Sequence, residues 1–142
     1  DTATTEIYTL SLHDALPICA GWLRPDLWKG KLMSYIKNMN PETSLKLADQ
    51  VAVLPGQIVS KTLAQNDAVS LTLFAFDQGE EISTHESEGD ALVLVLEGIG
   101  RFTIAGHVHF CKAGETIIMP AGKPHAVYAE MAFKMLLTVV FP

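Results

Sequence analysis

The sequence predicts an all-β protein, a sandwich or barrel of short antiparallel strands. From Ala48 onward, runs of β-branched and aromatic residues are separated by Gly, Pro, Asn or Asp. The separators recur roughly every 8 to 12 residues, a spacing typical of sandwiches and barrels. No long helical pattern interrupts the runs, which argues against a parallel sheet with helical crossovers.

The length of 142 residues predicts one domain. Residues 1–18, DTATTEIYTLSLHDALPI, are interpreted as a translated sequencing-library adapter fused to a reading frame, and they are excluded from the fold. Residues 19–32 are interpreted as read-through of upstream DNA, so 1–32 is an artefactual tail and the natural start is Met33, with Met39 as the alternative. Residues 33–47 are then a lead-in, and residues 48–142 are the barrel domain.

The elements are expected in the following order. Asn40 as a cap and Pro41 at the first helical position predict a turn or two of helix over residues 40–47. The strand-like runs then follow at 50–54, 57–64, 69–76, 81–85, 91–98, 101–106, 107–110, 115–122, 125–129 and 133–141.

Periodicity predicts which runs are buried. ALVLVL (91–96) and MLLTVV (135–140) are apolar on both faces, so both strands are expected to be central. RFTIAGHVHF (101–110) alternates, which predicts a hairpin with one apolar face. The set expected to point inward is Phe102, Ile104, Val108 and Phe110, and the set expected on the surface is Arg101, Thr103, His107 and His109.

Charge and composition exclude several classes of partner. The net charge is −6 and no basic run occurs, which argues against nucleic acid. The apolar runs are far shorter than the ~20 residues that span a bilayer, so no membrane partner is expected. With a start at Met33, Cys111 is the only native cysteine. One cysteine cannot form an intramolecular disulfide, which favours the cytoplasm.

Two spaced motifs stand out in the strand-rich region. Gly79 is followed after five residues by His85 and further on by Gly98; the second group is Gly114, Pro120, Gly122 and His125. With these motifs, residues 48–141 resemble a small single-domain cupin. The resemblance implies a double-stranded jelly-roll barrel. In metal-binding members of the family, three His and one Glu converge on a divalent ion inside the barrel.

The chain departs from that metal-binding pattern. Ser87, Ala91 and Ala129 stand where the motifs carry His, Glu and Asn, so only His85 and His125 remain. A transition-metal site usually needs three protein ligands.

One interpretation restores a third ligand with Asp90 or Glu88, which the backbone freedom of Gly89 would bring back to the histidines. The ion would be one divalent transition metal: Fe, Mn, Ni or Zn. In the metal-free interpretation, Asp90 caps its own turn, Glu86 and Glu88 are solvated, and the two histidines line a cup.

A further interpretation uses His85, oriented by Asp90, as a general base. This arrangement is similar to that of metal-free cupins acting on nucleotide sugars.

The function expected from these features is a cupin-domain protein that binds a small polar metabolite in the barrel. His85 and His125 are its site residues, with Ser87, Asp90 and Glu88 as auxiliary groups. The alternative is a metal-dependent isomerase, lyase or dioxygenase acting on a sugar or small carboxylic acid. A single barrel has too little interior for its apolar residues, so a homodimer is also expected.

Overall fold

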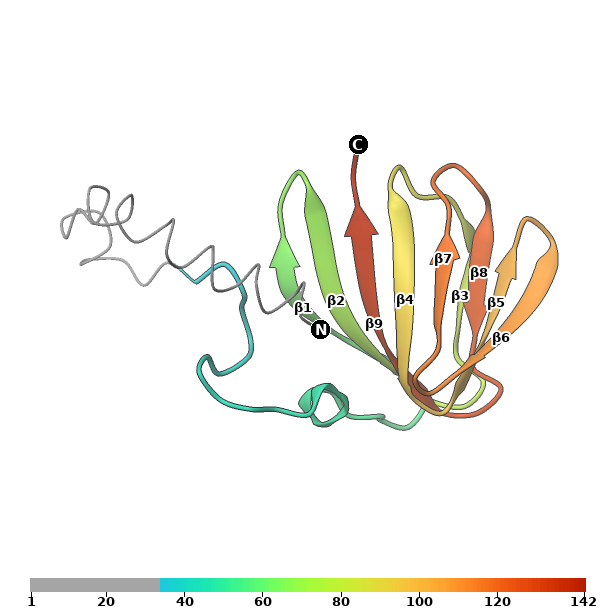
Figure 1. Ribbon diagram of the computed structural model, residues 1–142. Helices are drawn as coiled ribbons and strands as arrows, with labels where there is room; N and C mark the ends of the chain where they lie inside the picture. Colours follow the sequence, from blue (N-terminus) through green and yellow to red (C-terminus); the bar gives the residue numbers. More distant parts are fainter. Residues whose placement is uncertain (1–33) are drawn as a thin grey trace. The chain divides into compact units, whose positions relative to one another are not determined.

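Two antiparallel sheets make up the fold of residues 34–142, the part of the chain that the computed structural model describes (Figure 1). One sheet has the strand order β1 (Ile58–Gln65), β2 (Val69–Phe76), β9 (Phe133–Val140), β4 (Asp90–Glu97), β7 (Thr116–Met119). The other has the order β3 (Glu81–His85), β8 (His125–Tyr128), β5 (Ile99–Ile104), β6 (His107–Lys112). The predicted all-β class is confirmed. The interpretation of residues 1–32 as an artefactual tail, and of Met33 as the start, lies outside the described residues.

The two doubly apolar runs form inner strands, as predicted. β9 is the central strand of the five-stranded sheet, and β4 lies between β9 and β7. Ala91, Val93 and Val95 of β4 are buried against the facing sheet, whereas Leu92 points to the outer face and is 39% exposed. An inner strand covered on one side and partly covered on the other needs apolar residues on both faces.

The core between the sheets is centred on three aromatic rings. Phe133 stacks on Phe76 with ring centroids 4.7 Å apart and meets Phe102 edge-on at 6.1 Å. All three are essentially inaccessible to solvent. The smaller buried residues around them are Ala91, Val93, Val95, Ile104, Cys111, Met119, Val127, Ala129 and Met135.

The outer face of the five-stranded sheet is partly covered by the lead-in segment and by the residues that follow it, up to Val53. Val51 is buried with Leu63 and Leu73, and Leu47 packs against them. The helix predicted over residues 40–47 is wrong, because the only helical element there is a 3₁₀ turn, η1 (Leu47–Gln50). The strand predicted at 50–54 is also absent. The apolar side chains of these residues are buried by packing on the sheet. This tertiary packing outweighs the local signals that predicted a helix and a strand.

The β5–β6 hairpin turns through two residues. Ala105 and Gly106 both have positive φ, 49° and 84°, and Ile104 pairs directly with His107. Two such residues make the tight turn that matches the twist of a hairpin. Directly paired residues share a face of the sheet, so an even-numbered residue in β5 shares its face with an odd-numbered residue in β6.

The predicted faces of β6 were therefore wrong. Val108 and Phe110 point outward and are 55% and 60% exposed, although alternation carried through the turn placed them in the core. His107 and His109 lie on the inner side of this edge strand but remain exposed. Cys111 follows the same parity and is buried, at 3% exposure.

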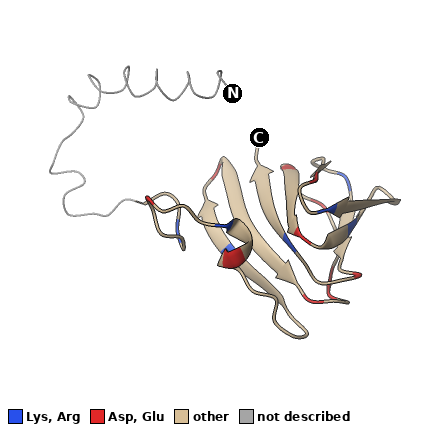
Figure 2. Cartoon of the chain, turned by 60° about the horizontal axis from the view of Figure 1, so that its bottom comes forward, with Lys and Arg blue, Asp and Glu red and all other residues tan. Residues whose placement is uncertain are grey.

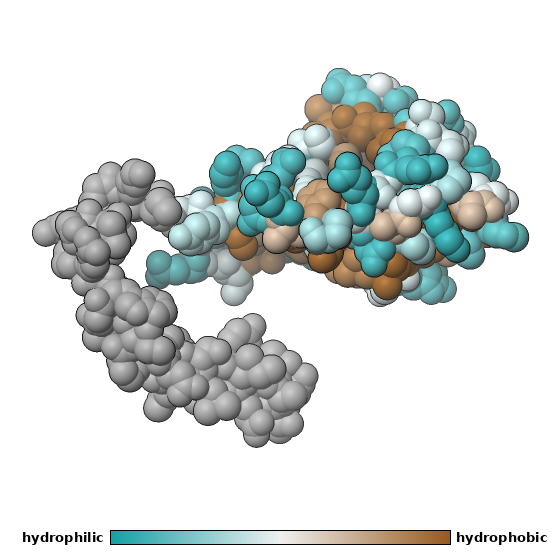
Figure 3. Space-filling model, turned by 90° about the horizontal axis from the view of Figure 1, so that it is seen from above, coloured by the Kyte–Doolittle hydropathy of each residue, from teal (hydrophilic) through white to brown (hydrophobic). Residues whose placement is uncertain are grey.

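Among residues 34–142, acidic residues outnumber basic ones. Acidic and basic residues are spread over strands and loops (Figure 2). Seen from the end at which the C-terminus lies, hydrophobic residues gather in patches between hydrophilic ones (Figure 3). Among residues 34–142, no helix has the length and apolar character to cross a bilayer.

Candidate functional site

His85 and His125 meet at one end of the sandwich. His85 ends β3, His125 begins β8, and the two are direct partners in the β3–β8 register. Their ring centroids lie 4.4 Å apart with the ring planes at 69°. Since β9 also ends here, this is the end of the described part that carries the C-terminus (Figure 1). The structure thus brings together the two histidines that the motifs singled out.

Both imidazoles are anchored by the backbone in the same way. His85 Nδ1 lies 2.8 Å from the carbonyl oxygen of Ser83, and His125 Nδ1 lies 3.0 Å from that of Lys123. A carbonyl oxygen only accepts hydrogen bonds, so in each ring Nδ1 carries the proton and donates it. In the neutral tautomer that results, Nε2 bears a lone pair. Neither Nε2 atom has a partner among the described residues.

The environment of His125 favours this neutral form. The residue is buried, at 2% exposure, while its partner His85 is exposed. Burial lowers the pKa of His125 below its ordinary value, and the neighbouring His85 acts in the same direction. The Lys123 carbonyl and the Glu86 carboxylate oppose this shift in pKa without reversing it.

The histidine pair borders a cavity of about 240 Å³ between the two sheets. Its polar lining consists of His85, Glu86, Ser87 and His125, which come from the end of β3, the loop after it and the start of β8. The rest of the lining is apolar: Ile82, Ala91, Met119, Val127, Met135, Leu137 and Val139. An apolar chamber with a few polar groups at one end is the usual form of a small-molecule site.

The residues that line this cavity do not complete a transition-metal site. Ala91 contributes a methyl group where the metal-binding pattern has a carboxylate, and Ser87 supplies only a neutral hydroxyl. Ser87 Oγ already accepts a hydrogen bond from Gly89 N at 3.2 Å. Within residues 34–142, no group of three or more His, Cys, Asp or Glu is arranged to hold an ion. The two free Nε2 atoms fall short of the usual three ligands.

The two carboxylates proposed from sequence lie elsewhere. Asp90 Oδ1 accepts a hydrogen bond from Ala121 N at 2.8 Å, and both Asp90 and Glu88 border a different cavity. Among the described residues Asp90 is bonded to Ala121 and not to His85, whose Nδ1 donates to the Ser83 carbonyl, so the proposed pairing of His85 with Asp90 is not formed. The carboxylate that borders the histidine cavity is Glu86, which is exposed to solvent, as the metal-free interpretation expected. Its position next to His85 in the chain was the available signal.

The other histidines and the cysteine form no comparable site. His109 and Cys111 border a separate surface cavity with Glu115. His107 is not among the residues that line this cavity. Burial raises the pKa of the Cys111 thiol, and the Glu115 carboxylate raises it further. The thiol is therefore protonated at neutral pH and is a poor nucleophile.

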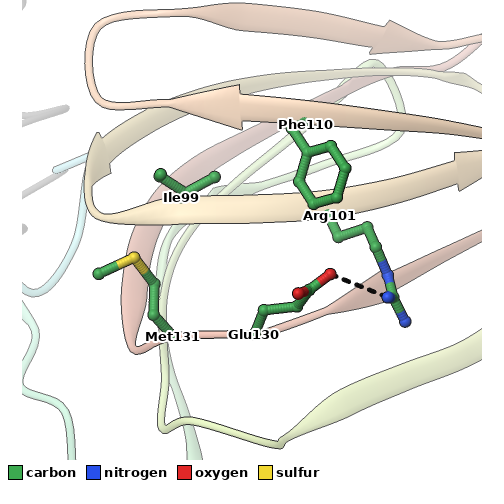
Figure 4. A pocket seen from close by; sticks show the side chains of 5 residues that line it. All are labelled: Ile99, Arg101, Phe110, Glu130 and Met131. Atoms are coloured by element: carbon green, nitrogen blue, oxygen red, sulfur yellow. Dashed lines mark hydrogen bonds and ion pairs between the residues drawn. The ribbon is translucent and has the colours of Figure 1, made fainter.

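A larger cavity of about 300 Å³ lies on the outer face of the four-stranded sheet (Figure 4). Phe110 and Arg101 border it with Ile99, Glu130 and Met131. The Arg101 guanidinium pairs with the Glu130 carboxylate at 2.9 Å and lies 4.4 Å from the centre of the Tyr128 ring. Since Arg101 and Glu130 pair with each other, their charges are less available to bind a ligand than the free Nε2 atoms of the histidine cavity.

Comparison with known proteins agrees with the geometry. A family model described as Cupin domain matches residues 72–141. A conserved protein of unknown function from Streptococcus pyogenes is 44% identical, with a TM-score of 0.77, and the match covers 79% of this chain and 98% of that one. A cupin superfamily protein from Desulfitobacterium hafniense is 33% identical, with a TM-score of 0.73, and the match covers 77% of this chain and 100% of that one.

More distant similarity extends to an enzyme. Salicylate 1,2-dioxygenase from Pseudoaminobacter salicylatoxidans has a TM-score of 0.55 at 19% identity, over 66% of this chain and 28% of that one, which shows the fold alone. Among curated proteins, none matches the chain. The fold, the histidine pair and the two close structural relatives together show that the chain belongs to the cupin superfamily.

Proposed function

We propose that this cupin binds a small molecule in the histidine cavity, without turnover. The observation that carries the proposal is the division of the cavity into an apolar chamber and a polar end formed by His85, Glu86, Ser87 and His125. The chamber suits the apolar body of a ligand, and the polar end suits one polar substituent. A location in the cytoplasm, which the sequence led us to expect, belongs to the same proposal.

The size of the cavity limits the ligand. An apolar cavity of about 150 Å³ is enough for benzene. The cavity here, at about 240 Å³, is of the size needed for one six-membered ring with one or two substituents. A compact metabolite fits this description, whereas a nucleotide sugar is too large to be enclosed.

A metal-dependent enzyme, acting on a sugar or a small carboxylic acid, is the second candidate. It is favoured by the two adjacent imidazoles, whose Nε2 atoms are free while their Nδ1 atoms are held by carbonyls, an arrangement common around metal ions. It requires a third donor, and Glu86 is the carboxylate that lines the cavity. One bound ion of Fe, Mn, Ni or Zn would then be found per chain.

Filling the cavity tests the first candidate. The full chain is screened by thermal shift against small ring compounds with one polar group, since a ligand that binds only the folded state raises Tm. Ala91→Leu, which extends a side chain into the cavity, is expected to abolish the shift. Leu92→Met, one residue along on the opposite face of β4, is expected to retain it. A shift that survives Ala91→Leu would place binding elsewhere.

Elemental analysis separates the two candidates. The full chain, purified without an affinity tag, is expected to contain no stoichiometric metal. One equivalent of metal that is lost in both His85→Ala and His125→Ala, and weakened in Glu86→Gln, would favour the enzyme. His107→Ala is the matched control, because His107 is exposed and does not border the cavity.

A further inference from the structure

We infer that the ligand presents a hydrogen-bond donor, a hydroxyl, phenol or amine, to the histidine pair, and that the cavity discriminates against carboxylates and other anions. This inference rests on the proposed binding function and specifies the chemical class of the ligand. It also narrows the expectation from sequence, which described the bound ligand only as a small polar metabolite.

The first support is the direction of the histidine hydrogen bonds. Both Nδ1–H groups are already donated to backbone carbonyls, so neither ring has a second proton to offer in its neutral form. The remaining Nε2 atoms of His85 and His125 are acceptors. A hydroxyl or an amine brings the proton that an acceptor needs, whereas a carboxylate is itself acceptor-only.

The second support is the charge around the cavity. No Lys or Arg is among the residues that line it, and the charged group that does line it is the Glu86 carboxylate. Lys123 contributes its backbone carbonyl to His125. An anion at this end would lose its hydration without gaining a cation, which is unfavourable in a partly buried site.

Matched pairs of compounds test the inference. The full chain is titrated at about pH 8, above the ordinary histidine pKa, with benzyl alcohol, benzylamine and benzoate, and with cyclohexanol and cyclohexanecarboxylate. Binding is followed by the ¹⁵N shifts of the histidine rings, which report directly on Nε2. The alcohols and the amine are expected to bind about tenfold or more tightly than the carboxylates, since only they give a hydrogen bond to a free Nε2 acceptor. The Nε2 resonances of His85 or His125 are expected to move, and those of His107 to stay.

The relative affinities for alcohols and carboxylates decide whether the inference holds. Binding of alcohols in preference to carboxylates, lost in His85→Phe, supports the inference, since phenylalanine keeps a ring but has no acceptor. Equal or tighter binding of carboxylates overturns the inference and leaves the binding function standing. Binding of none of the compounds overturns both. His85 is exposed, so this variant is expected to fold, and circular dichroism of each variant checks it. The titrations of the unsubstituted chain do not depend on any variant.

Discussion

His85 and His125 face each other across the β3–β8 pair, and each is held by the carbonyl oxygen two residues before it. The two rings differ in one respect, because His125 is buried and His85 is exposed. This asymmetry gives the pair one ring whose burial opposes protonation and one ring in contact with solvent.

The free energy of unfolding is expected to depend on pH through His125. Its pKa is lowered in the folded state, so the unfolded chain binds more protons between that value and about 6.5. Stability is therefore expected to rise with pH through this window and to be fully present above it. Urea denaturation across the window should show a shallower rise in His125→Gln. An unchanged rise in that variant, with a loss in His107→Gln, would assign the effect to another histidine.

The aromatic core predicts a contrast between two phenylalanines. Phe133 is 1% exposed and contacts Phe76 and Phe102, so Phe133→Ala is expected to cost about 3–5 kcal/mol of unfolding free energy. Phe110 is 60% exposed on the outer face, and Phe110→Ala is expected to change stability by no more than about 0.5 kcal/mol. Chemical denaturation of the two variants measures both values. Similar losses would contradict the observed faces of β6.

The thiol of Cys111 is expected to be unreactive in the folded protein. It is buried, and its raised pKa keeps it protonated near neutral pH. In a Cys19→Ser variant, which leaves Cys111 as the sole cysteine, a disulfide reagent should modify the thiol slowly until denaturant is added. Rapid modification under native conditions would mean that β6 opens readily at the sheet edge.

The homodimer expected from the sequence stays a prediction, and the outer face of the five-stranded sheet is where we propose it. Leu92 and Ile118 are direct partners across β4 and β7 and are 39% and 55% exposed. They extend an apolar face that the lead-in segment covers only in part. A second copy packed by two-fold symmetry would cover the remainder.

A charge placed on that face tests the assembly. Ile118→Lys is expected to convert the dimer into a monomer in light scattering at micromolar concentration. Val108→Lys is the matched control, because Val108 is equally exposed, at 55%, on the outer face of the other sheet. A monomer before substitution, or a dimer lost only in Val108→Lys, would refute this interface.

The sequence was sufficient for the class of fold, for the central strands and for bringing His85 and His125 together at one end of the sandwich. Strand-length periodicity indicates which residues are buried. The two spaced motifs indicate which residues lie at the ends of particular strands, as His85 does in β3 and His125 in β8. The faces of β6 could not be obtained in this way, because one two-residue turn at Ala105 and Gly106 reverses the parity of everything after it. The positions of Glu88 and Asp90 could not be obtained in this way either, because they depend on loop contacts such as that between Asp90 and Ala121.

The hydrogen bonds between these loops are expected to affect how fast a ligand enters and leaves the proposed binding cavity. Asp90 Oδ1, at the first residue of β4, accepts a hydrogen bond from Ala121 N, and Gly122 N donates to the carbonyl oxygen of Ser87 at 2.9 Å. Two hydrogen bonds therefore join the β3–β4 loop and the start of β4 to the β7–β8 loop. The β3–β4 loop follows His85, the last residue of β3, and the β7–β8 loop leads to His125, the first residue of β8. Separating one loop from the other therefore means breaking both bonds, so the residence time of a bound molecule is expected to be governed by the lifetime of this junction as well as by its contacts inside the cavity.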